Sequence, residues 1–262
     1  MKEPQKTNNS NQDVLGFDIG GANTKVVLAR VTGSSIELRA HALRYYPIWQ
    51  KSKNELPVML SEIAQDVGYA DGDSVCAAIT AELSDAYETK REGILHVLSS
   101  LQQVFPTATI QIFTTPGFFQ PPEAILLDPL PAAAANWVAT ARWVSSTCPD
   151  CILIDIGSTT VDIIPIVNGQ VAAQGRTDLT RLLHGELVYT GVLRATIPSV
   201  ACQVPFRGQQ CPISFEKFAT IADVHLILGT ITENQYTTET ADGRPPTLEY
   251  AYARLARIVC AD

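Results

Sequence analysis

Short apolar runs separated by turn signals dominate the first part of the chain. Residues 13–19 and 24–31 are apolar and typical of strands, and Gly20-Gly21 separates them. Residues 35–42 alternate between apolar and polar positions, as a third strand does. Only tight turns join these runs, so the pattern predicts three consecutive strands joined by hairpins.

Longer segments with helical spacing follow these strands. Apolar residues recur at helical intervals over residues 53–67 and 90–105, and Pro106 ends the second of these segments. A buried strand is predicted between them at 74–80, and an Ala-rich helix is predicted over 130–146. Strands that alternate with helices in this way indicate an α/β protein.

The remaining predicted elements are shorter. Further strands are predicted at 109–115, 124–127, 151–157, 160–167 and 170–174. A loop rich in Pro, Gly and aromatic residues, 115–122, separates the first two, and Asn168-Gly169 is predicted to form a turn. Residues 218–229 and the segment from Leu248 onward are predicted to be helical.

The tripeptide Asp-Ile-Gly occurs twice, each time at the end of an apolar strand. Asp18 and Asp155 align at an offset of 137 residues, and Gly20 then aligns with Gly157. The next turn of each half falls within one residue of the same alignment. Two similar units in one chain predict a pseudo-twofold architecture with a cleft between the halves.

A carboxylate at a strand end, followed by Gly and small residues, is typical of phosphate and metal sites. Gly and Ser let the backbone approach closely and direct its N–H groups toward an anion. Asp18 and Asp155 are candidate ligands of Mg²⁺, which bridges phosphate oxygens. The candidate phosphate-binding residues are Gly20, Gly21, Asn23 and Lys25 in the first loop and Gly157, Ser158, Thr159 and Thr160 in the second.

Charge narrows the choice of partners. The chain has 262 residues, a net charge of −8 and a pI of about 5.0. This balance disfavours nucleic acid or an anionic membrane as a partner, because both require a cationic surface. An anionic substrate is therefore expected to be held by local backbone dipoles and a metal ion.

The ends of the chain and its cysteines add little. Residues 1–12 are polar and are expected to be a disordered lead-in without a signal peptide, which makes the cytoplasm the expected compartment. Six cysteines are present, and Cys148 and Cys151 form a C-x-x-C motif. Cys202 and Cys211 lie too far along the chain to complete a familiar zinc pattern, so a metal site is disfavoured there.

Several motifs outside the two loops resemble one known family. They are "TAELSDAYETKREGI" (80–94), "AAANWVATA" (133–141), "RLLHGELVYTGVLRA" (181–195), "FATIADVHLILG" (218–229) and "TADGRP" (240–245). Together with the loops they resemble the hydantoinase/oxoprolinase family, in its branch linked to tetrahydromethanopterin one-carbon metabolism. The resemblance covers about residues 13 to 262. It implies an actin/Hsp70/sugar-kinase-like (ribonuclease H-like) fold.

The resemblance also implies a reaction. The implied reaction is similar to the condensing step of methanofuran or methylofuran biosynthesis. In that step the phenol of a γ-glutamyltyramine-like or tyrosine-derived substrate displaces diphosphate from an aminomethylfuran-methyl diphosphate. Glu82, Asp85, His184 and Glu186 are the candidate catalytic residues, since a phenol with a pKa near 10 gains from a general base. Helix capping by Glu82 and Asp85, and a surface loop for His184 and Glu186, stay open as alternatives.

Other functions also stay open. One is an ATP-dependent amidohydrolase of the hydantoinase/oxoprolinase type, or a small-molecule kinase. Another is a non-catalytic actin-like protein that binds a nucleotide or a partner. The loops hold either ATP or the diphosphate of the substrate, and the latter is favoured because a glycine-rich adenosine-binding segment is not found. The expected partners are a small-molecule diphosphate and a phenolic amine, and a homodimer is a further expectation.

The predicted organisation is a lead-in at 1–12, a first half at 13–130 and a second half at 131–262. The second half is expected to carry an inserted substrate segment and to be incomplete at its C-terminal end. Asp223 is interpreted as a helix cap or a cleft residue, and His225 as structural. Arg207, in the Pro- and Gly-rich segment 204–212, belongs to a substrate loop or a connector.

Overall fold

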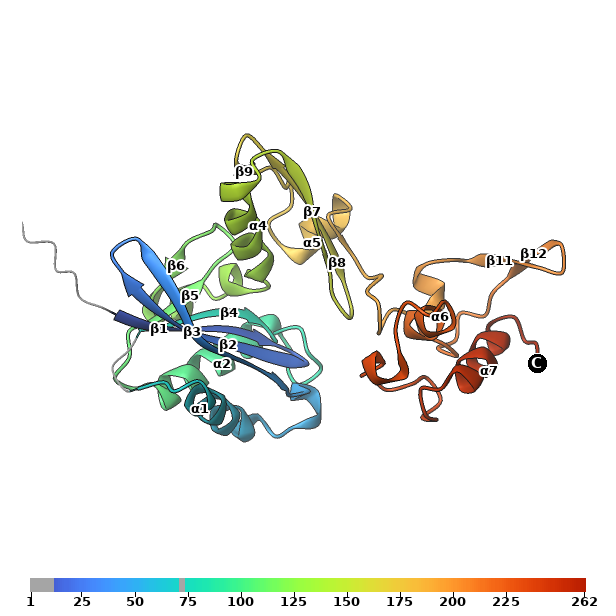
Figure 1. Ribbon diagram of the computed structural model, residues 1–262, viewed down its shortest axis with the longest axis horizontal. Coiled ribbons are helices and arrows are strands. Elements are labelled where there is room, and N and C mark those ends of the chain that lie inside the picture. Colours follow the sequence, from blue (N-terminus) through green and yellow to red (C-terminus); the bar gives the residue numbers. More distant parts are fainter. Residues whose placement is uncertain (1–11, 71–73) are drawn as a thin grey trace, which may run out of the picture. The chain divides into compact units, whose positions relative to one another are not determined.

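The computed structural model describes residues 12–70 and 74–262 (Figure 1). The predicted lead-in lies outside the described residues, except for Gln12, which begins the first strand. The chain forms two compact units that divide between Thr147 and Cys148. This division comes later than the predicted boundary at 130/131, because the backbone of Pro131 accepts a hydrogen bond from Thr115 N–H at 2.8 Å within the first unit.

Six strands form one mixed sheet in the first unit. They are β1 (Gln12–Gly20), β2 (Asn23–Thr32), β3 (Ser35–Tyr45), β4 (Ser74–Thr80), β5 (Ile110–Phe113) and β6 (Phe119–Gln120). Their order is β3-β2-β1-β4-β5-β6, with β1 to β3 antiparallel and β4 parallel to both β1 and β5. The three leading strands are joined by hairpins, as predicted.

Two helices cover one face of this sheet, α1 (Leu56–Asp66) and α2 (Lys90–Val104) (Figure 1). Short 3-10 turns, η1 (Ile48–Gln50) and η2 (Lys53–Glu55), lead into α1. Alternate residues of β1 point into the core beneath these helices, and Phe17 is one of them. Both helices lie where the apolar spacing predicts them.

The segment after β5 differs from the prediction. The strand predicted at 124–127 is wrong, because these residues belong to a helix, α3 (Pro122–Leu127). Pro122 occupies its first turn, where a missing N–H costs nothing, and so short an apolar run does not distinguish strand from helix. The helix predicted at 130–146 is split into η3 (Leu130–Ala132) and α4 (Asn136–Thr147), with Ala134 at a φ of 46° between them.

The second unit begins with another hairpin-led sheet. Its strands are β7 (Cys151–Ile156), β8 (Val161–Val167), β9 (Gln170–Val171) and β10 (Leu187–Val188), and all pairs are antiparallel. The predicted turn at Asn168-Gly169 is confirmed, with φ values of 51° and 71°. β9 ends earlier than the predicted 170–174, and α5 (Asp178–Leu183) follows it. Both units therefore open with antiparallel strands joined by hairpins, as the predicted actin/Hsp70/sugar-kinase-like fold requires.

The rest of the second unit is a hairpin with small helices. Its elements are η4 (Ile197–Ser199), β11 (Gln203–Phe206), β12 (Gln209–Pro212), α6 (Ile221–Ile227), η5 (Glu233–Gln235) and α7 (Leu248–Ile258). Asp223 accepts a hydrogen bond from Thr220 N–H at 2.9 Å and one from Arg254 Nε at 2.8 Å. It therefore caps α6 and joins it to α7. Arg207 lies in the turn between β11 and β12, with a φ of 50°.

Candidate functional site

The first loop places a charged pair at the end of β1. Asp18 and Lys25 are cross-strand partners, and Lys25 Nζ lies 3.0 Å from Asp18 Oδ2. Asp18 Oδ1 is buried and has no hydrogen-bond partner among the described residues. The Lys25 side chain is 60% exposed. The pair therefore presents an exposed ammonium group to an anion, while one carboxylate oxygen of Asp18 is buried and unsatisfied within the part of the chain that the structure describes.

The backbone of the first loop is held tightly from two sides. The carbonyls of Gly21 and Ala22 accept hydrogen bonds from Ile48 N–H and Tyr46 N–H, at 2.9 and 2.8 Å. A Cβ atom at Gly20 would lie 2.7 Å from the carbonyl oxygen of Asn23, so only glycine fits there without a shift of the backbone. This agrees with the predicted need for glycine, while the phosphate-binding role stays a prediction.

The end of β4 lies beside the first loop. Because β4 runs parallel to β1, with Gly20 opposite Thr80, the two strands end at the same edge of the sheet. Glu82 follows two residues later and is 2% exposed. A Cβ atom at Gly21 would lie 3.5 Å from Ser84 Cβ, so the turn after β4 packs on the loop. The structure thus brings Glu82 to the same edge as Asp18.

Neither Glu82 nor Asp85 is the N-cap residue of a helix. Helix α2 begins at Lys90, and Thr89 caps it by accepting a hydrogen bond from Glu92 N–H at 3.1 Å. Asp85 is exposed in the turn before the helix. Thr89 is thus the N-cap residue of α2, and the catalytic interpretation of Glu82 and Asp85 stays a prediction.

A tyrosine–histidine pair behind Glu82 was not found from the sequence. Tyr87 Oη and His96 Nδ1 are 2.7 Å apart in a hydrogen bond. Burial raises the pKa of Tyr87 and lowers that of His96, so both are held neutral. A Cβ atom at Gly93 would lie 2.6 Å from Glu82 Cα and 2.9 Å from the Tyr87 ring. The close approach of α2 thus positions Glu82, and the glycine in "KREGI" was its one sequence signal.

The second loop is clamped by a later segment of the same unit. The carbonyl of Ser158 accepts hydrogen bonds from the N–H groups of Leu193 and Arg194, at 3.1 and 2.8 Å. A Cβ atom at Gly191 would lie 2.5 Å from the carbonyl carbon of Thr159. Residues 191–194 therefore determine the shape of this loop, and sequence analysis missed this role of the "TGVLR" motif.

Asp155 faces another carboxylate where Asp18 faces a lysine. Its cross-strand partner is Asp162, whose Oδ1 accepts a hydrogen bond from Arg181 Nη1 at 2.7 Å. Burial raises the pKa of Asp162, the Arg181 guanidinium opposes this shift, and the charge of Asp155 adds to it. Arg181 is only 1% exposed. The second loop is therefore more acidic than the first.

Glu186 and His184 lie in different surroundings. The two carboxylate oxygens of Glu186 accept hydrogen bonds from Gln174 N–H at 2.6 Å and Gly175 N–H at 2.9 Å. Glu186 is 7% exposed and so fastens the chain after β9. His184 is exposed at the end of α5. These contacts favour a structural role for Glu186, and a catalytic role for either residue stays a prediction.

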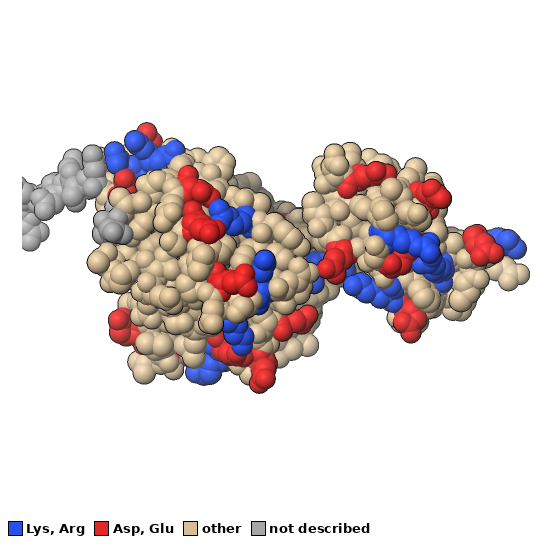
Figure 2. Space-filling view, turned by 90° about the horizontal axis from the view of Figure 1, so that it is seen from below, with Lys and Arg blue, Asp and Glu red and all other residues tan. Residues whose placement is uncertain are grey.

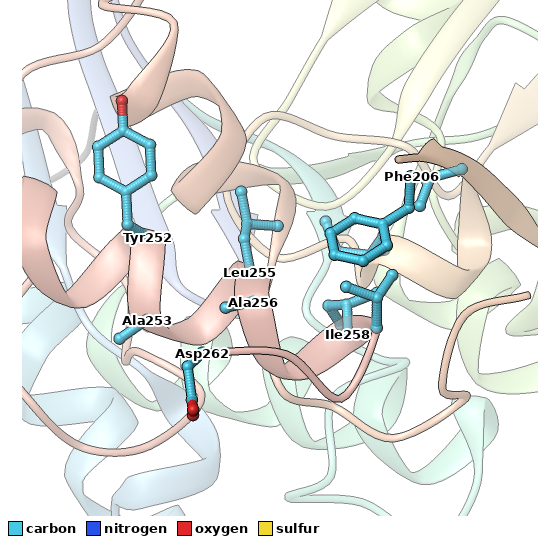
Figure 3. Close-up of a pocket in the computed structure, with 10 residues that line it drawn as sticks. Phe206, Tyr252, Ala253, Leu255, Ala256, Ile258 and Asp262 are labelled. Carbon is cyan, nitrogen blue, oxygen red and sulfur yellow. The ribbon is translucent and has the colours of Figure 1, made fainter. Parts of the chain in front are cut away.

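The second unit contains a pocket (Figure 3). It has a volume of about 490 Å³ and apolar walls formed mainly by α7 and β11, including Leu255, Ile258 and Phe206. None of the predicted site residues lines it. Figure 2 shows acidic and basic side chains interspersed on the face it draws, so neither sign forms a continuous patch there.

No cluster of three or more His, Cys, Asp or Glu side chains able to hold a metal occurs within residues 12–70 and 74–262. Asp18 has a buried carboxylate oxygen without a hydrogen-bond partner in these ranges, and Asp155 is exposed, so either carboxylate on its own suits a Mg²⁺ ion held mostly by water; the metal site stays a prediction. Among the described helices, none has the length and apolar character needed to cross a membrane.

Comparison with known proteins identifies the family. The model of the hydantoinase/oxoprolinase family matches residues 73–262. This chain belongs to the hydantoinase/oxoprolinase family. The match covers β4, the second loop and the segment that clamps it, and it begins after the first loop.

Two curated relatives of this family member share one name. A (4-{4-[2-(gamma-L-glutamylamino)ethyl]phenoxymethyl}furan-2-yl)methanamine synthase of Methanocaldococcus jannaschii is 40% identical over 250 residues, which are 95% of this chain and 72% of the relative. The synthase of that name from Methanococcus vannielii is 42% identical over 113 residues, 43% of this chain and 50% of the relative. The predicted similarity to a synthase of methanofuran biosynthesis is thereby confirmed.

Solved structures resemble the family member more distantly. A Ppx/GppA family member from Aquifex aeolicus is 12% identical, with a TM-score of 0.39 over 62% of this chain and 49% of that chain. The ethanolamine utilization protein EutJ from Carboxydothermus hydrogenoformans is 15% identical, with a TM-score of 0.37 over 66% of this chain and 51% of that chain. The chain thus spans about half the length of these structures.

Proposed function

We propose that this protein is a transferase that joins a furan-methyl diphosphate to a phenol and releases diphosphate. The similarity to the Methanocaldococcus jannaschii synthase, at 40% identity over 95% of the chain, carries the proposal. The product in that relative's name contains a phenoxymethyl group on a furan ring. An ether of this kind forms when a phenol oxygen attacks a furan-methyl carbon.

The proposed reaction breaks one C–O bond and forms another. The bond between the methylene carbon and the diphosphate breaks, and its electron pair leaves with the diphosphate. The phenol oxygen forms the new bond to the methylene carbon, and the phenol proton passes to a base. Positive charge develops on the furan-methyl group, where the ring oxygen delocalises it. Catalysis therefore requires groups that stabilise the leaving anion and a base for the phenol.

The first loop suits the leaving diphosphate. Lys25 presents an exposed ammonium group, and the glycines allow close approach of the backbone. Asp18 would hold Mg²⁺, which when bound neutralises charge on the diphosphate. Glu82, buried at the neighbouring strand end, is the proposed base. The second loop carries further hydroxyl groups that suit phosphate binding, those of Ser158, Thr159 and Thr160.

The test omits ATP. The full chain is incubated with aminomethylfuran-methyl diphosphate, γ-glutamyltyramine and Mg²⁺, and both diphosphate and the ether product are measured. We expect the two products in equal amounts. Glu82→Gln should lower kcat by about 10²- to 10⁴-fold, the usual contribution of a general base, while Glu123→Gln on the exposed start of α3 should not change it.

The family name supports one competing function, an ATP-dependent amidohydrolase or kinase. That function predicts ADP release that depends on an amide or hydroxyl substrate. Ether formation that requires ATP, or ADP release without ether, would overturn the proposed reaction.

A further inference from the structure

We infer that the open face of β2 and β3 beside the first loop holds the furan ring of the substrate, with Tyr45 as the aromatic platform beneath it. This inference rests on the proposed function and adds a residue that stabilises the furan-methyl group as positive charge develops.

Successive side chains of β3 point to opposite faces of the sheet. Ala40 and Ala42 pack against the core beneath α1 and α2. Leu43 and Tyr45 point to the opposite face and are 64% and 55% exposed. This opposite face is the one that carries Lys25, since Lys25 is exposed while its neighbour Thr24 is buried. Large apolar side chains thus lie on the same side of the sheet as the proposed anion site.

The strand register brings these groups close together. Leu43 is the cross-strand partner of Lys25, Tyr45 is that of Asn23, and Lys25 is that of Asp18. Direct partners in an antiparallel pair lie about 5 Å apart at Cβ, and diagonal neighbours about 7–8 Å apart, within reach of aromatic and lysine side chains. The Tyr45 ring and the Lys25 ammonium group therefore both reach the same small area of the sheet surface.

The backbone holds Tyr45 next to the loop. Tyr46, the next residue, donates its N–H to the carbonyl of Ala22 at 2.8 Å. The position of Tyr45 is therefore tied to the backbone that we propose contacts phosphate. A furan-methyl diphosphate has only one carbon and one oxygen between its ring and its first phosphorus. A substrate whose diphosphate lies against Lys25 thus brings its ring over Leu43 and Tyr45.

The chemistry of an aromatic ring suits this place. The face of a tyrosine ring is electron-rich and attracts cations. The furan-methyl group is neutral in the bound substrate and becomes positive as diphosphate leaves. The attraction to Tyr45 therefore grows toward the transition state, and an interaction of this kind raises kcat more than it lowers KM. Lys25 complements the charge of the diphosphate at the other end of the breaking bond.

Three variants distinguish the contribution of the Tyr45 ring from that of its hydroxyl group and from that of any exposed apolar side chain on β3. Tyr45→Phe keeps the ring, and Tyr45→Leu removes it. Leu38→Ala is the matched control, because Leu38 is 60% exposed on β3 but is the cross-strand partner of Ala29, away from the loop. We expect kcat for ether formation to fall roughly tenfold in Tyr45→Leu and to stay within about twofold in Tyr45→Phe and Leu38→Ala.

A binding measurement distinguishes this inference from the proposed reaction. Titration calorimetry compares inorganic diphosphate with a furan-methyl analogue whose bridging oxygen is replaced by CH₂, so that it does not react. Wild type should bind the analogue more tightly than diphosphate, and Tyr45→Leu should lose this difference while its affinity for diphosphate is unchanged.

The outcomes lead to distinct conclusions. If wild type forms no ether but shows the Tyr45-dependent gain in affinity, the proposed reaction falls and the furan platform stands. If Tyr45→Leu matches wild type in both kcat and binding, or Tyr45→Phe fails as badly as Tyr45→Leu, the platform is overturned even where ether forms.

Discussion

An Asp-Ile-Gly sequence stands at the end of both β1 and β7, with Gly157 just beyond β7, yet the apolar faces of the two strands have opposite surroundings. Three alternate apolar positions of β1 are at most 4% exposed, whereas the aligned positions of β7 are 57% to 67% exposed. The aligned residues are Leu15, Phe17 and Ile19 in β1 and Ile152, Ile154 and Ile156 in β7. The same pattern therefore specifies a strand in both places but does not specify what covers it.

The difference arises from neighbours that are distant in sequence. β1 lies between β2 and β4, and α1 and α2 pack on its apolar face. β7 pairs only with β8 among the described strands. The charged positions diverge as well: Lys25 faces Asp18, while the aligned Asp162 faces Asp155 and relies on Arg181. A repeated motif thus acquires a different electrostatic setting in each half.

The largest expected effect contrasts the two apolar faces. Phe17→Ala should lower the free energy of unfolding by about 3–5 kcal/mol, because it leaves a cavity in the core of the first unit. Ile154→Ala should cost less than about 1 kcal/mol, because the side chain is largely exposed. All three tryptophans lie in the first unit, so urea unfolding monitored by tryptophan fluorescence measures the effect of Phe17→Ala. Amide hydrogen exchange in β7 and β8 measures the effect of Ile154→Ala. Equal losses of stability in the two variants would contradict the difference between the two faces.

A similar contrast is expected between the two charged pairs. Arg181→Met should destabilise the second unit by about 3–5 kcal/mol, since it leaves Asp162 half-buried without its partner. Lys25→Met should change stability by less than about 1 kcal/mol, because Lys25 is 60% exposed and water reaches its ion pair with Asp18. Hydrogen exchange in each unit measures both changes. A double variant, Arg181→Met with Asp162→Leu, should recover part of the loss if the unpaired carboxylate causes it.

The glycines of the two loops sharpen the comparison at smaller cost. Gly20→Ala should cost about 1–3 kcal/mol, because its Cβ atom would lie 2.7 Å from a backbone oxygen that has little freedom to move. Gly157→Ala should cost about 1 kcal/mol or less, since the nearest atom, Thr160 O, is 3.3 Å away. Urea unfolding measures the first variant and hydrogen exchange the second. A reversed order would show that the second loop is the more constrained.

The smallest expected effect is in the titration of two aspartates. Asp162 should titrate above 3.8, because burial raises its pKa, so it stabilises the fold at low pH and this contribution is lost as pH rises through the folded pKa. Asp13 should titrate below 3.8, because its hydrogen bond with Arg30 lowers its pKa, and its contribution is lost as pH falls. Carboxyl-carbon NMR measures both midpoints. Midpoints on the same side of 3.8 would contradict the difference between the units.

Local pattern was sufficient for most of the elements and for the two loops. The hairpins, α1, α2 and the Asn168-Gly169 turn follow from spacing and turn residues that act over a few positions. The run at 124–127 failed because four apolar residues fit a strand or a helix equally well. Of the candidate site, Glu82 beside the first loop follows from the parallel ends of β1 and β4, but the contacts of Glu186 join residues that no local pattern connects.

The sequence alone specified strand ends with a carboxylate, a glycine and small residues, because backbone conformation there depends on neighbours along the chain. It also carried the family motifs that assign the chain to the hydantoinase/oxoprolinase family. Burial of the apolar face of β1, exposure of that of β7, and the partners of Asp18 and Asp162 required tertiary structure. These properties depend on which distant segments pack together, and the sequence of the tripeptide does not determine those segments.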